Sequence, residues 1–166
     1  NFLIARRFMY WQVYFHKTAV AAERMLIKIL GRAKELSLAG ETLFATPALA
    51  YFLTQSVTTE TFDKQSETLD HFIHLDDSDI LSAIKVWADH NDVVLSTLSR
   101  HFINRKLFKT TTCEPLSASE RADLLAAYSN HFGISEHEAS YFFEARAITT
   151  STYDFTDAKI LILLND

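Results

Sequence analysis

Apolar and polar residues are mixed along the first thirty positions in a pattern that is typical of a long α-helix. Neither glycine nor proline occurs from residue 2 to residue 30, and strong helix formers recur throughout. Charged side chains interrupt the apolar positions, so no run approaches the ~20 apolar residues that a membrane span needs. The pattern predicts one long helix of roughly 40 Å, at about 1.5 Å per residue, that packs against a protein core.

Capping residues in front of apolar stripes predict four further helices. The four helix starts are Thr46 and Pro47 before residues 48–53, residues 76–79 before residues 80–88, residues 91–92 before residues 94–103, and residues 117–120 before a helix that stops at Gly133. Residues 135–138 could add one more turn, and residues 61–72 are polar enough to be half exposed.

The last part of the chain has a different pattern. Residues 107–112 are β-prone, and residues 141–148 and 160–164 read as two strands joined by a loop rich in threonine, serine and aspartate. We therefore expect a mainly α-helical fold in which residues 1–109 form a helical lobe and residues 110–166 form a small α+β tail.

Composition supports a folded chain and excludes some classes of partner. Of the 166 residues, 48% are hydrophobic and only 5 are glycine or proline, which is enough to bury a sizeable core. The net charge of −5 provides no general basic field for nucleic acid or an anionic membrane. Cys113 is the single cysteine, so no internal disulfide can form, and we expect a cytoplasmic protein.

One face of the first predicted helix carries groups that could bind an anion. Arg6, Tyr10, Tyr14 and Lys17 are separated by four, four and three positions, which places them on one side of a helix. Arginine, tyrosine and lysine together suit a phosphorylated ligand. The alternative is that both tyrosines pack as amphipathic side chains while the two cations extend to solvent.

Two other clusters could have a function. His71, His74, Asp76 and Asp77 could hold zinc or manganese, although helix capping already explains the aspartates. Residues 104–109 form a compact basic patch, either a solvated turn or an anion contact. The chain contains no glycine-rich phosphate loop, Gly-x-Ser-x-Gly or His-Glu-x-x-His motif.

Three stretches together resemble a known family. They are Arg-Arg-Phe-Met-Tyr-Trp-Gln-Val-Tyr-Phe-His-Lys over residues 6–17, Leu-Asp-Asp-Ser-Asp-Ile over residues 75–80, and Asn-Arg-Lys-Leu-Phe-Lys over residues 104–109. In order and spacing they resemble the part of HD-domain deoxynucleoside triphosphate triphosphohydrolases that follows the metal motif. The resemblance is closest to bacterial HD-superfamily phosphohydrolases, and the mammalian SAM-and-HD-domain enzyme is more distant.

This resemblance implies substrate-binding roles on the first helix. Arg6 stands where the family places an arginine on the substrate triphosphate, and Tyr14 where it places a tyrosine that lines the sugar pocket. Tyr10, on the same face, stands where the mammalian relative has a histidine.

The resemblance also implies regulatory contacts and an oligomer. Lys17, Arg105 and Lys109 match positions that contact activating nucleotides at subunit interfaces in the mammalian relative. A homo-oligomer is expected on the same ground.

The metal motif of the family is absent from this chain. The family holds a divalent ion (Mg, Mn, Fe or Zn) with a histidine, a His-Asp pair and a distant aspartate. Here no histidine is followed by aspartate, since Asp70-His71 and Asp89-His90 have the reverse order. We therefore expect no metal ligand in this chain, with the ligands upstream of Asn1, and we interpret the chain as a piece of a longer enzyme that is inactive alone.

The expected function is the C-terminal part of a metal-dependent phosphohydrolase that converts deoxynucleoside triphosphates to deoxynucleoside and triphosphate. Its expected partners are a nucleotide substrate and the segment that carries the metal motif. The alternative is a non-catalytic helical module for interaction, oligomerisation or nucleotide sensing.

Overall fold

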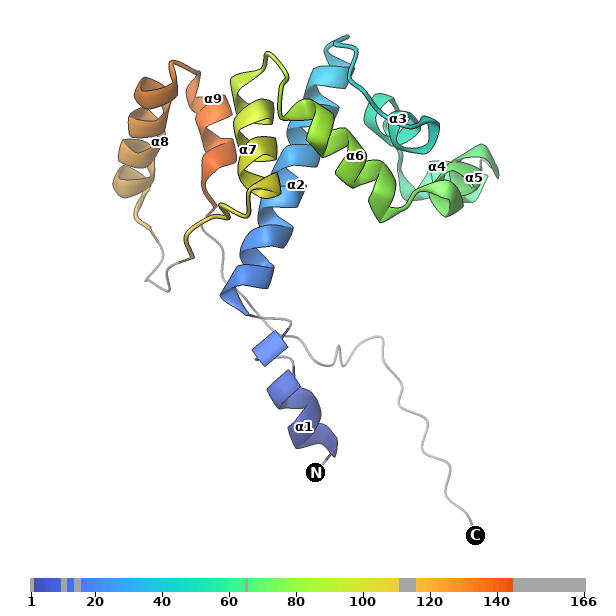
Figure 1. Cartoon of the computed structure of the whole chain (residues 1–166), viewed down its shortest axis with the longest axis horizontal. Helices are drawn as coiled ribbons and strands as arrows, with labels where there is room; N and C mark the ends of the chain where they lie inside the picture. Colours follow the sequence, from blue (N-terminus) through green and yellow to red (C-terminus); the bar gives the residue numbers. More distant parts are fainter. Residues whose placement is uncertain (1, 10–11, 14–15, 65, 111–115, 145–166) are drawn as a thin grey trace.

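The computed structural model describes residues 2–9, 12–13, 16–64, 66–110 and 116–144, and these residues are mainly α-helical (Figure 1). The helices are α1 (Phe2–Met9), α2 (Lys17–Leu38), α3 (Pro47–Thr54), α4 (Thr59–Lys64), α5 (Ser66–His74), α6 (Asp77–Trp87), α7 (Val93–Ile103), α8 (Ala118–Phe132) and α9 (Glu136–Ala139), followed by the short 3₁₀ helix η2 (Ser140–Phe142). The prediction of a mainly α-helical fold is confirmed.

Helix α2 runs through the middle of the molecule, and other helices pack along it. In Figure 1, α3 to α6 lie on one side of α2, while α7, α9 and α8 follow on the other side. Helix α1 lies beyond the N-terminal end of α2 and extends away from the body of the molecule. Among the described residues, no helix is both long and apolar enough to cross a membrane.

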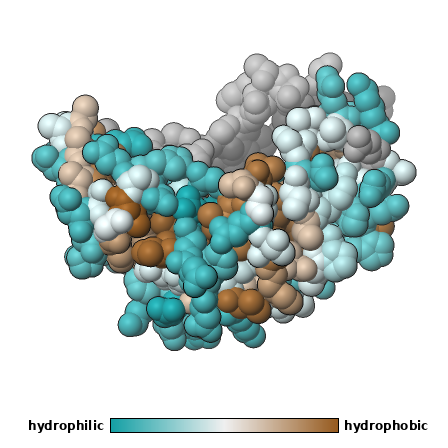
Figure 2. Space-filling view, turned by 90° about the horizontal axis from the view of Figure 1, so that it is seen from above, coloured by the Kyte–Doolittle hydropathy of each residue, from teal (hydrophilic) through white to brown (hydrophobic). Residues whose placement is uncertain are grey.

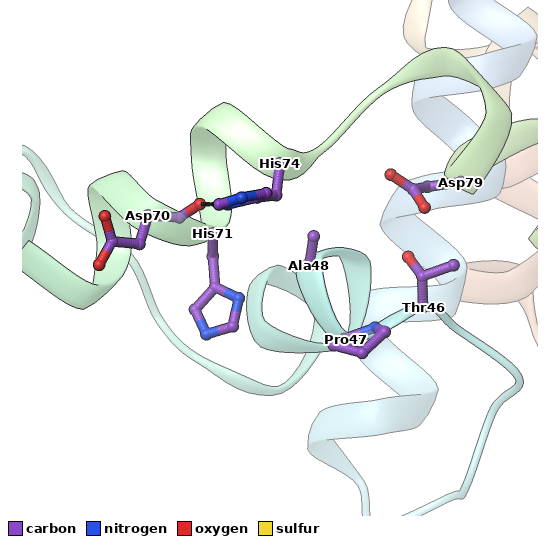
Figure 3. A pocket seen from close by; sticks show the side chains of 7 residues that line it. All are labelled: Thr46, Pro47, Ala48, Asp70, His71, His74 and Asp79. Carbon is purple, nitrogen blue, oxygen red and sulfur yellow. Dashed lines mark hydrogen bonds between the residues drawn. The ribbon is translucent and has the colours of Figure 1, made fainter.

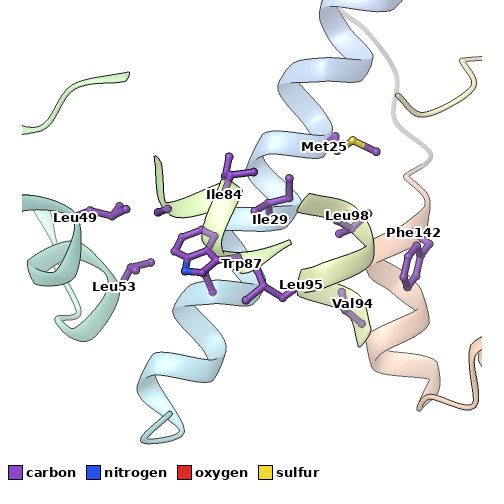
Figure 4. Packing of buried hydrophobic residues seen from close by; sticks show 12 residues of the cluster. Met25, Ile29, Leu49, Leu53, Ile84, Trp87, Val94, Leu95, Leu98 and Phe142 are labelled. Atoms are coloured by element: carbon purple, nitrogen blue, oxygen red, sulfur yellow. The ribbon is translucent and has the colours of Figure 1, made fainter. Parts of the chain in front are cut away.

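The hydrophobic core forms where α2 meets α3, α6 and α7 (Figure 4). Met25, Ile29 and Ala33 of α2 are spaced by four residues, so they form a stripe on one side of that helix. Trp87 of α6 is almost fully buried, and its indole N–H donates to the Phe44 carbonyl at 2.9 Å. The core also contains Leu49 and Leu53 of α3, Ala83 and Ile84 of α6, Val94, Leu95 and Leu98 of α7, and Phe142 of η2.

Side-chain caps form at three of the four predicted helix starts, while Thr46 precedes α3 without a side-chain cap hydrogen bond. Asp76 and Ser117 each belong to a capping box, in which the cap accepts from the third helical backbone N–H and the third side chain accepts from the cap. Asp92 caps α7 by accepting from the Leu95 N–H at 2.7 Å. Gly133 ends α8 in the left-handed conformation that glycine tolerates, with φ of 66°.

The prediction of one continuous helix over residues 2–30 is wrong. Helix α2 begins at Lys17, because His16 leaves the helical conformation and its Nδ1 accepts from the Thr18 N–H at 3.3 Å. Helix α2 also extends beyond Leu30, through Gly31 to Leu38.

The prediction of a strand that starts at Tyr141 is also wrong. Tyr141 and Phe142 belong to η2, and Phe142 stacks on Phe132 of α8 with ring centroids 4.6 Å apart. Packing against α8 therefore outweighs the β-propensity of these aromatic residues. Residues 107–110 likewise form no strand, while residues 111–112, 145–148 and 160–164 lie outside the described part of the chain.

Candidate functional site

The predicted substrate residues lie at the N-terminal end of the molecule. Arg6 is on α1 and is exposed to solvent. Tyr10 and Tyr14 lie outside the described residues. Phe2, Ile4, Phe8 and Met9 on the same short helix are also exposed, at 46–76% of their surface. Helix α1 thus carries Arg6 on the same face as Phe2 and Met9, two apolar side chains that are exposed in the described part of the chain.

Two of the predicted regulatory cations lie on neighbouring segments. Lys17 is the first residue of α2, and its carbonyl accepts from the Thr110 hydroxyl at 3.3 Å. Lys109 directly precedes Thr110, so the segment that follows α7 returns to the start of α2. Arg105 lies at the other end of this segment, with an unusual positive φ of 56°. All three cationic side chains are exposed.

His71 and His74 line an open pocket of about 370 Å³ between α3, α5 and the start of α6 (Figure 3). The aspartates that line it are Asp70 and Asp79, and not the predicted Asp76 and Asp77. His71 stacks on Tyr51 with ring centroids 4.3 Å apart. The Nδ1 of His74 lies 2.6 Å from the Asp70 carbonyl oxygen. Each imidazole is therefore held by a neighbouring group of the protein.

The aspartates of this cluster stabilise the start of α6. Asp76 accepts from the backbone N–H groups of Ser78 and Asp79 at 2.7 and 3.2 Å. The Asp79 carboxylate accepts from the Asp76 N–H at 2.9 Å, and this hydrogen bond holds the pKa of Asp79 below its usual range. The capping interpretation is confirmed. No group of three or more ligands suited to a metal ion occurs within the described ranges.

A buried charge network was not predicted from the sequence. Arg32 of α2 is only 6% exposed and donates to Asp92 through two nitrogens, at 3.2 Å from Nε and 2.6 Å from Nη2. It also donates to Glu35 at 2.9 Å and to Glu138 of α9 at 2.7 Å. Tyr141 donates to Glu35 at 2.9 Å. The network joins α2, α7, α9 and η2.

The network lowers the pKa values of its carboxyl groups. Burial alone would raise the pKa of Asp92, but hydrogen bonds from Arg32 and from the Leu95 N–H outweigh it and keep the pKa below its usual range. The pKa of Glu35 is lowered for similar reasons, and that of Glu138 chiefly by hydrogen bonds from Ser135. Because all three carboxylates bond to the same cation, Arg32, the network is suited to holding helices together.

The signal for this network lies in the spacing of Arg32. Arg32 lies beside the apolar stripe of α2, one position before Ala33. A residue at that position is expected to face the core, and an arginine there needs buried partners for its charge. Its partners Asp92 and Glu138 are cap and capping-box residues, so their local roles hid the long-range contact.

Comparisons with known proteins provide one named activity. No protein-family model matches the chain. An uncharacterised protein of Bacillus subtilis (strain 168), YwfO, is 33% identical over 155 residues, which are 93% of this chain and 33% of that protein. A crystal structure of a phosphohydrolase (BT4208) from Bacteroides thetaiotaomicron VPI-5482 matches with a TM-score of 0.81 and 51% identity, over 85% of this chain and 36% of the solved one. The chain thus has the fold of one part of that phosphohydrolase and spans about a third of the length of both proteins.

Proposed function

We propose that this chain is part of a metal-dependent HD-type phosphohydrolase that acts on nucleotides. The observation that carries the proposal is the 51% identity and TM-score of 0.81 to a protein named phosphohydrolase. The ordered motifs at residues 6–17, 75–80 and 104–109 support the narrower assignment, the conversion of deoxynucleoside triphosphates to deoxynucleoside and triphosphate.

In this proposal, Arg6 binds the substrate phosphates. A guanidinium group presents a planar set of donors that matches phosphate oxygens, and it becomes more effective when water is excluded. The exposed Phe2 and Met9, which lie four and three residues from Arg6 and so on the same face of α1, support such a closed site. The rest of a longer protein could pack on this face and enclose Arg6. Tyr14 is proposed to line the sugar pocket, and Tyr10 to contribute to substrate binding.

The described residues do not fit a catalytic metal site. They contain no group of three suitable ligands, and the chain has no His-Asp pair. The proposal therefore assigns the divalent ion (Mg, Mn, Fe or Zn) to the rest of the whole protein. It follows that the 166-residue chain alone should not hydrolyse nucleotides.

A second, regulatory nucleotide is proposed to bind at the start of α2 and the segment that follows α7. Lys17 and Lys109 lie on segments joined by the Thr110 hydrogen bond, and all three cations, Arg105 included, are exposed. Exposed cations on adjoining segments suit the phosphates of a nucleotide held between subunits of a homo-oligomer.

The test measures nucleotide hydrolysis by the whole protein with Mg or Mn. We expect release of triphosphate from deoxynucleoside triphosphates, and a loss of about 100-fold in kcat/KM for Arg6→Ala, because a charge-stabilising donor is removed. Lys85→Ala is the matched control, since Lys85 is an exposed cation on α6, and it should retain activity. Unchanged turnover in Arg6→Ala would remove the role of Arg6. If no nucleotide is hydrolysed, the non-catalytic interaction module is favoured instead.

A further inference from the structure

Helix α5 presents an apolar face to solvent. Leu69, Phe72 and Ile73, which we name the α5 face, are 49%, 55% and 65% exposed. Their spacing of three and four residues places them on one side of the helix. The opposite side is anchored, because Thr68 is fully buried and its hydroxyl lies 2.7 Å from the Tyr51 hydroxyl. Contact with α3 therefore fixes α5 with the α5 face directed outward.

Aromatic side chains of α3 and α4 pack against Phe72 of the α5 face. The Phe72 ring packs edge to face on Phe62 of α4, with centroids 5.3 Å apart, and on Phe52 of α3, with centroids 6.5 Å apart. These contacts hold Phe72 in place before any partner arrives, which reduces the entropy lost on binding. Figure 1 places α4 and α5 at the end of the molecule opposite to α8.

The segment that carries the α5 face is rich in exposed acidic residues. Between residues 59 and 79 the only lysine or arginine is Lys64, which already lies 3.6 Å from Glu60. In the view of Figure 2, the end of the molecule that carries α3 to α5 is mostly hydrophilic. The exposed acids of this segment are Glu60, Asp63, Glu67, Asp70, Asp76 and Asp77.

The negative charge near the α5 face determines which kind of partner can bind there. A second copy that paired symmetrically through the same face would bring like charges together, and an anionic membrane would be repelled. A helix with lysine or arginine beside its own apolar stripe would satisfy both parts of the surface. We propose that the α5 face is a docking surface for a basic amphipathic helix of a protein partner. This inference does not depend on the proposed hydrolase activity.

The probe is a labelled synthetic helix of leucine, alanine and lysine in amphipathic order, compared with a scrambled peptide of the same composition. Fluorescence anisotropy with the whole protein should show binding that weakens with salt. No binding of the ordered peptide would overturn the proposal, because the rest of the protein would then cover the α5 face. The scrambled peptide, with equal charge but no apolar stripe, should bind about tenfold more weakly. Ile73→Ser should weaken binding of the ordered peptide about tenfold, and Asp70→Lys should weaken it and reduce its salt dependence.

Leu124→Ser is the matched control, since Leu124 is an exposed leucine on α8 next to the acidic Asp123. This variant should bind the peptide as the unsubstituted chain does, and circular dichroism should show all variants folded. Equal losses in Leu124→Ser and Ile73→Ser, or unchanged binding in Ile73→Ser, would overturn the proposal. A dimer that sedimentation detects and that Ile73→Ser dissociates would also overturn it, because the occupant would then be a second copy.

Discussion

Arg32 and Asp92 form a two-point ion pair across the middle of the molecule, 60 residues apart in the chain. The side chains are 8% and 13% exposed, and Asp92 also caps α7. One aspartate therefore fixes both the start of α7 and its position against α2.

Removing the positive partner should be strongly destabilising. Arg32→Met would leave Asp92, Glu35 and Glu138 without their shared cation, so we expect a loss of ~3–5 kcal/mol in the free energy of unfolding. Urea denaturation followed by circular dichroism measures this loss. Arg121→Met is the control, because Arg121 is an exposed arginine on α8, and it should cost about 0.5 kcal/mol or less. Equal stability of the two variants would show that the buried network contributes little.

The same network predicts a loss of stability in acid. The pKa values of Asp92, Glu35 and Glu138 are lowered in the folded state from ordinary values of 3.8 for aspartate and 4.5 for glutamate. Such groups stabilise the fold above their unfolded pKa values, and this contribution is lost as the pH falls through the lowered folded values. Thermal unfolding measured from neutral pH down through this range should show a falling midpoint. In Asp92→Asn the fall should be shallower, and an unchanged slope would exclude Asp92 as a cause.

Replacement of two glycines by alanine should change the stability of the protein in opposite directions. Gly31 lies inside α2, where an added Cβ would be 3.8 Å from Tyr141 Cε1, an ordinary contact. Gly31→Ala should stabilise the protein by about 0.5–1 kcal/mol, because alanine loses less entropy in a helix. Gly133→Ala should destabilise it by roughly 1–2 kcal/mol, since its φ of 66° strains any residue with a Cβ. Differential scanning calorimetry measures the unfolding temperature of both variants. Shifts of the same sign in the two variants would contradict this pair of predictions.

The capping role of Asp76 predicts a moderate loss. Asp76→Ala removes the acceptor for two backbone N–H groups at the start of α6 and should cost about 1 kcal/mol. Asp77→Ala, one residue further on and exposed, should cost less. Chemical denaturation of both variants measures the difference. If Asp77→Ala were the more damaging change, the cap would have been assigned to the wrong aspartate.

Helix starts were predictable because capping is local. Asp76, Asp92 and Ser117 each bond to backbone groups two or three residues away, so the residue types alone indicate the geometry. The same locality made Gly133 a predictable helix end. Of the residues predicted for the site on the first helix, Arg6 lies on α1, while Tyr10 and Tyr14 lie outside the described residues.

The amino-acid sequence by itself determined the helical class, most helix starts and the stripe of α2 that forms the core, because these follow from spacing and short-range hydrogen bonds. Only the tertiary structure decided that Arg32 would be buried among three carboxylates, that Tyr141 and Phe142 would form a 3₁₀ turn, and that the α5 face would stay open. These features depend on residues far apart in the chain, such as Arg32 and Glu138, which meet only after α9 packs on α2. Long-range burial and charge pairing leave no fixed spacing in a sequence, so they became visible only in the folded chain.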